Sequence, residues 1–201
     1  MAARLFGLAV LAGLVAGCDL HPGPDSTQRY RQWLKSGHEQ QAAAYTAHLR
    51  DEGVDAVLPL PDLLRSGRRW RKCQAEEFSL PPRAQWRAMT PTLKLVAELR
   101  AAGVLKDARV ASAWRHRDLN DCEGGSSRSR HLENNALDFD VVAGADVTAL
   151  CEFWRRRGAA HRFGLGFYSP TAIHVDTSGF RTWGHDHHRG TSLCERDVPA
   201  R

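Results

Sequence analysis

Two stretches that carry candidate metal ligands place the strongest constraint on how this chain can fold. In the first, residues 129–140, His131 and Asp138 stand in polar surroundings with six residues between them. In the second, residues 164–177, a short run of β-forming residues contains His174. Asp138 and His174 are 36 residues apart, so one ion can bind all three side chains only if the fold brings the two stretches together.

This set of donors predicts a particular chemistry. Zinc held by two imidazoles and one carboxylate, with its fourth position open, is a catalytic arrangement in which a water bound at that position has its pKa lowered to about 7. His131, Asp138 and His174 therefore predict a zinc hydrolase. A lone histidine and aspartate at this spacing are common by chance, so the prediction depends on the third ligand and on the surrounding motifs.

The amino terminus has the composition of a bacterial lipoprotein signal. Residues 1–17 contain one positive charge, a short apolar core and small residues immediately before Cys18. Cleavage before Cys18 and lipidation of that cysteine would anchor the protein to a membrane, with residues 18–26 as a short tether. A plain secretory signal or a short membrane anchor is the alternative, although the apolar run is shorter than the roughly 20 residues of a spanning helix. Both interpretations place the domain in the cell envelope, facing the periplasm or the outside.

Four further cysteines are expected to form two disulfides. They are Cys73, Cys122, Cys151 and Cys194. An even number of cysteines in an oxidising compartment predicts disulfides, and the sequence leaves all three pairings open. A four-cysteine zinc site is the alternative, but no two of these cysteines have the close C-x-x-C spacing that such sites usually use.

Length and charge limit the architecture and the partners. Without residues 1–17 about 180 residues remain, which is enough for one domain with a hydrophobic core and too few for two. We therefore expect a single, monomeric domain over residues 27–201. The net charge of +5 favours an acidic partner. Because the arginines are scattered and the chain is exported, we expect attraction to an anionic cell wall or to lipid headgroups, and no nucleic-acid binding.

Hydrophobic periodicity divides this domain into a helical N-terminal part, residues 27–89, and a catalytic core, residues 90–184. Residues 27–49 have apolar positions at helical spacing, with a break at Gly37. A short helix is expected to begin at Asp62, with the aspartate as its N-cap.

Two longer helices are predicted in the catalytic core. The first has Thr90 as its N-cap, Pro91 at its first helical position and Gly103 at its end. The second is capped by Asp146 and is expected to end at Gly158.

Strands are predicted between and after these helices. Residues 109–115 alternate in the manner of a strand, residues 136–142 are strand-like, and residues 164–177 suggest a hairpin followed by residues 181–184. The polar cluster at residues 185–188, His-Asp-His-His, has a metal-like composition. Because it lies in a glycine-bounded tail, we interpret it as a solvated loop.

Arg115 ends the first predicted strand. Its planar, always-charged guanidinium is suited to binding a substrate carboxylate or a developing oxyanion. From the residues alone, an ordinary surface arginine is the favoured interpretation.

An ordered set of motifs runs through the second half of the chain. It comprises Ser112-x-x-Arg115, Asn120, Gly124-Gly125, Ser129-x-His131, Ala136-x-Asp138, Gly164-x-Gly166-x-Tyr168 and Ile173-His174-Val175-Asp176-Thr177. The set resembles the D-Ala-D-Ala carboxypeptidase family of zinc peptidases, whose wider group includes lysostaphin-type enzymes and the hedgehog signalling domain. The His-Val-Asp-Thr strand is similar to that of the murein-processing peptidases, and the resemblance covers roughly residues 90–183.

The resemblance implies a fold and a set of roles. The fold is α+β, with a small antiparallel sheet, helices packed on one face and a zinc groove on the other, as in the hedgehog and DD-peptidase group. The two histidines and the aspartate named above would bind one Zn²⁺ ion. Arg115 and Ser129 would contact the substrate or its polarised carbonyl, and Tyr168 would also bind substrate.

The chain departs from this family pattern at two places. Asn134 stands where relatives usually have glycine, and we expect the turn to survive because Asn tolerates a positive φ. The general base of relatives lies two or three residues before the last ligand, where this chain has Thr171 and Ala172. Asp176 is the expected substitute, because residues two apart in a strand share a face; an equal alternative is that it holds His174 by the other ring nitrogen. Weaker candidates for the base are His161, Glu133 and Asp140.

The expected function is a membrane-tethered zinc peptidase that hydrolyses amide bonds in the peptide stems or cross-links of peptidoglycan. Zinc and Arg115 would stabilise the tetrahedral oxyanion. The sequence leaves open whether the reaction is that of a carboxypeptidase or of a murein endopeptidase. One alternative is a non-catalytic, zinc-containing lipoprotein that binds the cell wall, and a weaker one is a structural lipoprotein without metal.

Overall fold

The computed structural model describes residues 25–141 and 146–196. The predicted signal segment 1–17 and the predicted lipidation site Cys18 lie outside the described residues, as does Val142 at the end of the second predicted strand. Within the described part, helices combine with a five-stranded, mostly antiparallel sheet.

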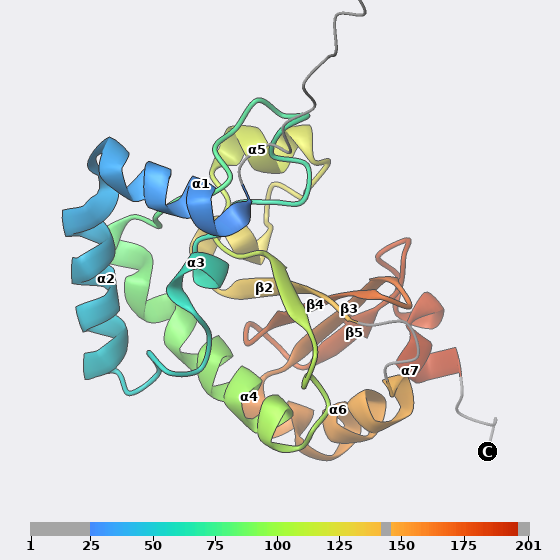
Figure 1. The fold of residues 1–201 in the computed structure, drawn as a ribbon. Coiled ribbons are helices and arrows are strands. Elements are labelled where there is room, and N and C mark those ends of the chain that lie inside the picture. Colours follow the sequence, from blue (N-terminus) through green and yellow to red (C-terminus); the bar gives the residue numbers. More distant parts are fainter. Residues whose placement is uncertain (1–24, 142–145, 197–201) are drawn as a thin grey trace, which may run out of the picture.

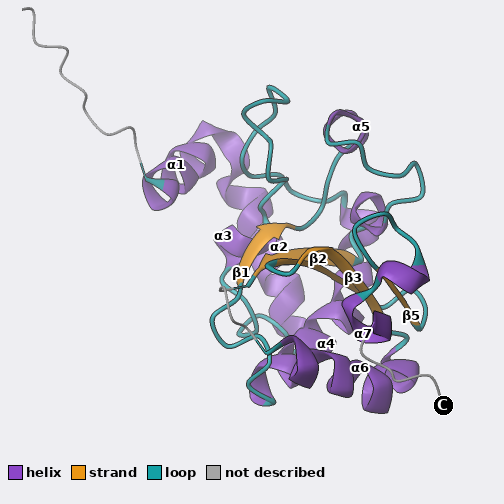
Figure 2. Ribbon diagram, turned by 90° about the vertical axis from the view of Figure 1, so that its right-hand side faces the viewer, coloured by secondary structure: helices purple, strands orange, loops and turns teal. Residues whose placement is uncertain are grey.

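The strands form one sheet in the order β1-β2-β4-β3-β5. Figure 2 draws these strands in orange. Neighbouring strands are antiparallel except β3 and β5, which run parallel at one edge. The bounds of the strands are β1 (Arg109–Ser112), β2 (Ala136–Asp140), β3 (Gly164–Ser169), β4 (Ala172–Asp176) and β5 (Arg181–Trp183).

The two faces of this sheet differ because side chains alternate along each strand. One face is apolar and fully buried, and its residues are Leu137, Phe139, Leu165, Phe167, Ile173 and Val175. They share a hydrophobic core with helices α4 (Met89–Ala101) and α6 (Val147–His161), which lie together beneath the sheet in Figure 1. The polar strand residues therefore point to the opposite face.

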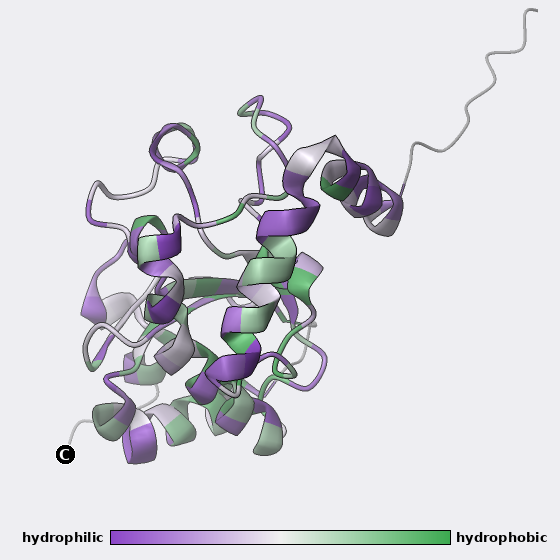
Figure 3. Cartoon of the chain, turned by 90° about the vertical axis from the view of Figure 1, so that its left-hand side faces the viewer, coloured by the Kyte–Doolittle hydropathy of each residue, from purple (hydrophilic) through white to green (hydrophobic). Residues whose placement is uncertain are grey.

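The first described residues are helical. Helices α1 (Ser26–Trp33) and α2 (Glu39–Asp51) are separated by a kinked turn, Leu34–His38, in which Gly37 has a φ of 112°. The break predicted at Gly37 is confirmed, since glycine adopts this conformation at little cost. In Figure 3 the outer surface of α1 is coloured mainly hydrophilic. None of the helices in the described part of the chain is both long and apolar enough to cross a membrane.

The short helix α3 (Leu60–Leu63) begins before Asp62, the residue at which the sequence predicts it. Pro59 is its N-cap and Pro61 lies in its first turn, where the missing N–H costs no hydrogen bond. The prediction of Asp62 as N-cap was therefore wrong, because prolines start this helix.

Helix α4 begins one residue before the predicted cap, Thr90. A 3₁₀ helix, Arg83–Ala88, leads directly into it, so α4 begins without a side-chain cap. Thr90 is buried inside the first turn, and Pro91 follows it there. The helix was predicted correctly and its cap was not.

Helix α6 begins as predicted and ends later. Asp146 accepts a hydrogen bond of 2.8 Å from the first turn, which confirms it as the cap. The helix continues past Gly158, its predicted end, and closes at Arg162 in the left-handed conformation. Gly158 lies inside the helix, where a Cβ would come within 2.6 Å of the exposed ring of Phe180, so a larger residue would require that ring to shift.

Both predicted disulfides are present, and the fold selects one of the three pairings. Cys73–Cys122 joins the loop after α3 to helix α5 (Arg117–Cys122). Cys151–Cys194 joins α6 to the C-terminal helix α7 (Leu193–Arg196). The loop segments at both ends of the polar sheet face are thus covalently tied to the fold.

Candidate metal centre

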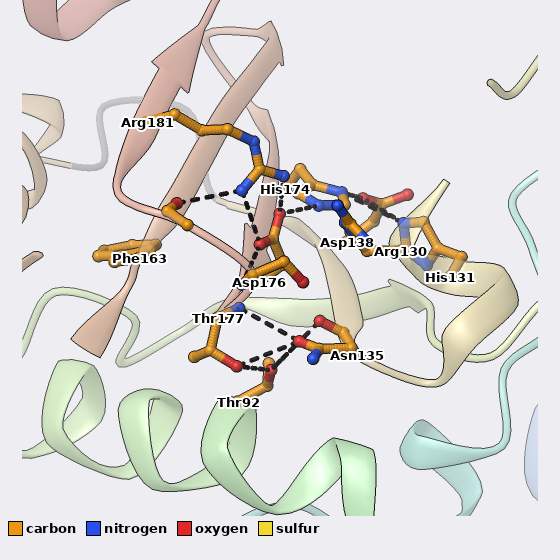
Figure 4. Close-up of polar contacts among 12 residues, drawn as sticks. Thr92, Arg130, His131, Asn135, Asp138, Phe163, His174, Asp176, Thr177 and Arg181 are labelled. Atoms are coloured by element: carbon orange, nitrogen blue, oxygen red, sulfur yellow. Dashed lines mark hydrogen bonds and ion pairs between the residues drawn. The ribbon is translucent and has the colours of Figure 1, made fainter. Parts of the chain in front are cut away.

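Three elements bring the predicted ligands together on the polar face of the sheet. Asp138 on β2 and His174 on β4 are direct partners in the antiparallel register, so their side chains project from the same face. A 3₁₀ turn, Arg130–Glu133, delivers His131 beside them. All three residues are buried, and their ligand atoms form one group (Figure 4).

The spacing of the three ligand atoms fits a small tetrahedral ion. His174 Nδ1 lies 3.0 Å from Asp138 Oδ1, and His131 Nε2 lies 3.1 Å from the same oxygen. The two ring nitrogens are 3.2 Å apart. Ligands at about 2.0–2.1 Å from a tetrahedral zinc ion are separated by about 3.3 Å, so one ion can contact all three atoms after small adjustments.

The hydrogen bonds on the far side of each ring direct a lone pair toward this point. His131 Nδ1 donates to the carbonyl oxygen of Ala113 at 2.6 Å, and His174 Nε2 donates to Asp176 Oδ2 at 3.0 Å. In the neutral rings, His131 Nε2 and His174 Nδ1 are therefore both acceptors, and they face a carboxylate oxygen. Three ligand-type atoms that converge in this way fit a bound cation.

The electrostatics of the buried cluster agree with this arrangement. Burial lowers the pKa of His131. Burial would also lower the pKa of His174, but hydrogen bonds to Asp138 and Asp176 outweigh this effect and raise the pKa of that ring. Burial raises the pKa of Asp138, but the two imidazoles outweigh this effect and hold that pKa well below its usual range. The cluster thus keeps an ionised carboxylate and attracts positive charge to His174 Nδ1, where a proton and a metal ion would compete.

Asp176 lies on the opposite side of His174 from the ligand cluster. It is 0% exposed, and it contacts the ring nitrogen that the metal would not use. Its two oxygens also accept hydrogen bonds from the Ser178 backbone at 2.7 Å and from Arg181 at 2.6 and 3.0 Å. Of the two roles predicted for Asp176, this geometry supports holding His174 and not that of a base, because both oxygens are occupied and face away from the ligand atoms.

The Gly-x-Gly motif of β3 is explained by the side chains that pack against it. Gly164 and Gly166 pair with Asp176 and His174 in the register, on the same face. A Cβ at Gly164 would lie 2.5 Å from an oxygen of Asp176, and one at Gly166 would lie 2.3 Å from the ring of Trp183. Glycine is required at both places because the side chains that support His174 fill that space.

Arg115 is buried and supports Asp138. It follows β1, and its Nη2 donates to Asp138 Oδ2 at 3.2 Å and to Ser112 Oγ at 3.0 Å. Its Nε lies 3.4 Å from Oε2 of Glu123, whose side chain is also largely buried. The interpretation of Arg115 as a surface arginine is wrong, and sequence reasoning missed Glu123, which only the chain path around Cys122 brings here.

A pocket of about 860 Å³ reaches two of the three candidate ligands, Asp138 and His174. Ser129 and Tyr168, both predicted to bind substrate, line it together with Asp138 and His174. The Tyr168 hydroxyl lies 3.3 Å from His174 Nδ1, and burial raises its pKa, so it stays protonated. The pocket is rich in arginine, and those that line it are Arg68, Arg69, Arg115, Arg128, Arg130, Arg181 and Arg189.

The remaining predicted residues are placed as follows. Asn134 has a φ of 54°, which confirms the left-handed turn. The weaker base candidates are engaged elsewhere: His161 lies 3.2 Å from Glu98, Glu133 pairs with Arg130, and Asp140 with Arg68.

The loop at residues 185–188 is exposed, as predicted, but it is not remote from the site. His187 from this loop lines the pocket. No motif in the sequence pointed to this placement.

The fold and the ligand cluster together define a class of protein: one with a candidate metal centre on one face of the sheet in a mixed α/β fold. Comparison with family models then gives the family. The model described as Peptidase M15 matches residues 62–176, more than half of the chain and all three candidate ligands. The chain therefore belongs to the M15 peptidases, the D-Ala-D-Ala carboxypeptidase-like zinc peptidases, which confirms the family resemblance. Comparisons with curated proteins and with solved structures give no match.

Proposed function

We propose that this protein is a zinc-dependent peptidase that hydrolyses amide bonds in the peptide stems or cross-links of peptidoglycan. The observation that carries the proposal is the convergence of three ligand atoms, 3.0–3.2 Å apart, beside a pocket open to substrate. His131, Asp138 and His174 would hold the ion. Zinc, when bound, supplies a Lewis acid that polarises a carbonyl group and lowers the pKa of water.

The chain's own residues have separable roles in this reaction. Asp176 fixes the orientation of His174. Arg115 fixes Asp138 through Nη2, and its Nη1, which has no hydrogen-bond partner in the described part of the chain, is the donor that we assign to the substrate. The protonated Tyr168 hydroxyl, close to His174 Nδ1, is placed to donate to the oxygen of the scissile carbonyl as negative charge develops on it.

The charge of the pocket supports an anionic peptide as substrate. Most of the arginines that line it form ion pairs with carboxylates. Among the described residues, the guanidinium groups of Arg69 and Arg128 have no carboxylate within ion-pair distance, although Arg69 donates to the Glu123 carbonyl. Two unneutralised cations at the pocket wall favour substrates that carry free carboxylates, such as peptidoglycan stems.

We also propose that the protein is a lipoprotein of the cell envelope, anchored through Cys18. The composition of residues 1–18 supports the anchor. The two disulfides, Cys73–Cys122 and Cys151–Cys194, fit an oxidising compartment outside the cytoplasm.

A second candidate function is a zinc-containing lipoprotein that binds the cell wall without turnover. The observation that favours it is the lack of an acid at the family's position: Thr171 and Ala172 stand there, and Ala172 lines the pocket. Asp176 does not replace the missing acid, because its oxygens are occupied.

Incubation of the purified, untagged protein with muropeptides distinguishes the two functions. The peptidase should contain about one zinc per chain and release new peptide products, detected by mass spectrometry, that disappear with a chelator and return with zinc. His131→Ala should lose both metal and products. His185→Ala, in the exposed tail, is the matched control and should retain both. Stoichiometric zinc without chelator-sensitive products would support the wall-binding protein, and absence of zinc from the wild type would refute both.

A further inference from the structure

Hydrolysis at this site requires a side chain that accepts a proton from water, and the described pocket offers few. Arginines line most of it and cannot accept a proton at neutral pH. The Glu123 carboxylate is held between the Arg115 side chain and the Arg69 backbone N–H, the latter at 2.6 Å. Tyr168 is protonated. Once the ligands, the arginines, Glu123 and Tyr168 are set aside, His187 is the titratable group that remains among the described residues of the pocket.

His187 and His174 both line the pocket. Its ring packs edge-on against Tyr168, with ring centroids 6.3 Å apart. Tyr168 in turn stands 6.3 Å from the His174 ring, and its hydroxyl is 3.3 Å from His174 Nδ1. His187 and His174 therefore both pack against the side chain of Tyr168.

The backbone at His187 adopts a conformation that non-glycine residues rarely take. Its φ is 63°, and a tight turn holds it: the His187 N–H donates to the Gly184 carbonyl at 2.9 Å, and the Gly184 N–H to His188 at 3.0 Å. A Cβ on Gly184 would lie 2.1 Å from the carbonyl oxygen of Thr191, so only glycine allows this turn. Unusual backbone conformations of this kind are maintained by their surroundings and are frequent in active sites.

The segment after this turn is fixed to the body of the protein. The hydroxyls of Thr182 on β5 and Ser192 are buried and hydrogen-bonded at 2.5 Å. Two residues later, Cys194 forms the disulfide with Cys151 of α6. His187 is thus exposed to solvent at its ring but carried by a turn with anchors on both sides.

We propose that His187 is the proton-transferring residue of this site and replaces the acid that is absent at Thr171 and Ala172. This inference rests on the proposed peptidase function. The unprotonated ring nitrogen of His187 takes a proton from the attacking water as its oxygen bonds to the scissile carbonyl carbon. When the carbon–nitrogen bond breaks, the imidazolium returns the proton to the nitrogen, which leaves as an amine, and the other product is a carboxylic acid that ionises to solvent.

Ionisable groups on several elements surround the His187 ring. From the sheet these are Asp138, Tyr168, His174 and Arg181; from the loops, Arg68, Arg69, Arg115, Glu123, Arg128, Arg130 and Arg189; and beside it in its own turn, His185, Asp186 and His188.

The test compares His187→Asn with His188→Asn in the full-length protein. Asparagine tolerates the left-handed backbone, so the first variant removes the proton acceptor and keeps the turn. The second, in the same exposed loop but outside the pocket lining, is the matched control. Zinc content, binding of a non-hydrolysable phosphinate analogue of a stem peptide, kcat, KM and the pH profile of kcat are measured for each.

For His187→Asn we expect kcat to fall by about 10²–10⁴-fold, the usual worth of general acid–base catalysis, with KM within about threefold of wild type. Zinc content and phosphinate binding should not change. The wild type should lose kcat toward acidic pH, and this loss should flatten in the variant. His188→Asn should match the wild type in every measurement.

Several results would overturn the inference. Turnover of His187→Asn within threefold of wild type, with the same acid limb, would show that another group moves the proton. Loss of zinc or of phosphinate binding together with turnover would assign His187 a structural role instead. If the wild type binds zinc and the analogue but releases no product, the peptidase function itself fails, and the inference fails with it.

Discussion

Replacing Asp176 with asparagine separates the two roles predicted for this residue. All the groups that contact its carboxylate are donors: His174 Nε2, the Ser178 backbone N–H and two nitrogens of Arg181. Asparagine has the same shape but only one acceptor oxygen, so in either orientation its NH₂ group faces other donors. The variant therefore loses at least two of four hydrogen bonds in a buried place.

The magnitude follows from these contacts. Unsatisfied buried donors cost about 1–3 kcal/mol each, discounted here for Arg181, whose side chain is 40% exposed. We expect the variant to be about 2–3 kcal/mol less stable in urea unfolding. Loss of the partner that orients a metal-binding histidine usually weakens metal binding by about 10–100-fold. We expect the zinc Kd of Asp176→Asn, measured by competition with a chromogenic chelator, to rise by that factor.

The kcat of Asp176→Asn distinguishes a residue that only holds His174 from one that transfers a proton. If Asp176 only holds His174, kcat at saturating zinc should stay within about tenfold of wild type, because zinc restores the site once it is bound. Asp140→Asn, an exposed aspartate on the neighbouring strand, is the control and should leave the zinc Kd unchanged. An unchanged zinc Kd combined with a loss of kcat of about 10³-fold or more would refute the reasoning and identify Asp176 as the base.

Three further predictions follow from the site and the fold. Zinc at about 1,000 times its Kd should stabilise the protein by about 4 kcal/mol, so chelation should lower the Tm by about 8–16 °C in calorimetry. His131→Ala should show no zinc-dependent shift of Tm, and an equal shift in that variant would contradict the ligand assignment. Gly166→Ala should destabilise the protein by about 1–3 kcal/mol in urea unfolding, because its Cβ would lie 2.3 Å from the Trp183 ring, and wild-type stability would contradict the close packing. Burial raises the pKa of Glu77, but the hydrogen bond and the charge of Arg29 outweigh this effect and lower that pKa below its ordinary value of 4.5. The stability that the ionised Glu77 carboxylate contributes is therefore present above pH 4.5 and is lost as the pH falls through the lowered pKa. The difference in unfolding free energy between wild type and Glu77→Gln should therefore be about 2 kcal/mol at pH 7 and should shrink below about pH 4; a difference independent of pH would contradict this ion pair.

Features with a local or periodic signal could be predicted from the sequence. The strand-like residues 136–142 and the hairpin expected over residues 164–177 predicted β2, β3 and β4, and the register of β2 and β4 places Asp138 and His174 opposite the apolar face. Helix α6 was predicted by its cap at Asp146, and the left-handed turn by Asn134. These predictions succeed because the relevant energies, hydrogen bonds of a cap or burial of one face, arise within a few residues.

Helix boundaries were predicted less well, because neighbours in space decide them. α4 begins before Thr90 because a 3₁₀ helix already precedes it. Gly158 looked like a helix end, but Phe180, 22 residues later in the chain, packs against it inside α6. A glycine selected for close approach and a glycine selected for a left-handed turn look the same in a sequence.

The amino-acid sequence by itself determined which side chains can bind a metal in this protein, His131, Asp138 and His174, because ligand chemistry belongs to the residue type. Only the tertiary structure decided on which side of His174 the carboxylate of Asp176 lies, and that Glu123 supports Arg115. It alone also brought His187 to the pocket. The physical reason is that these contacts depend on the direction of a side chain and on long-range register, disulfides and backbone strain, none of which leaves a periodic trace in the chain.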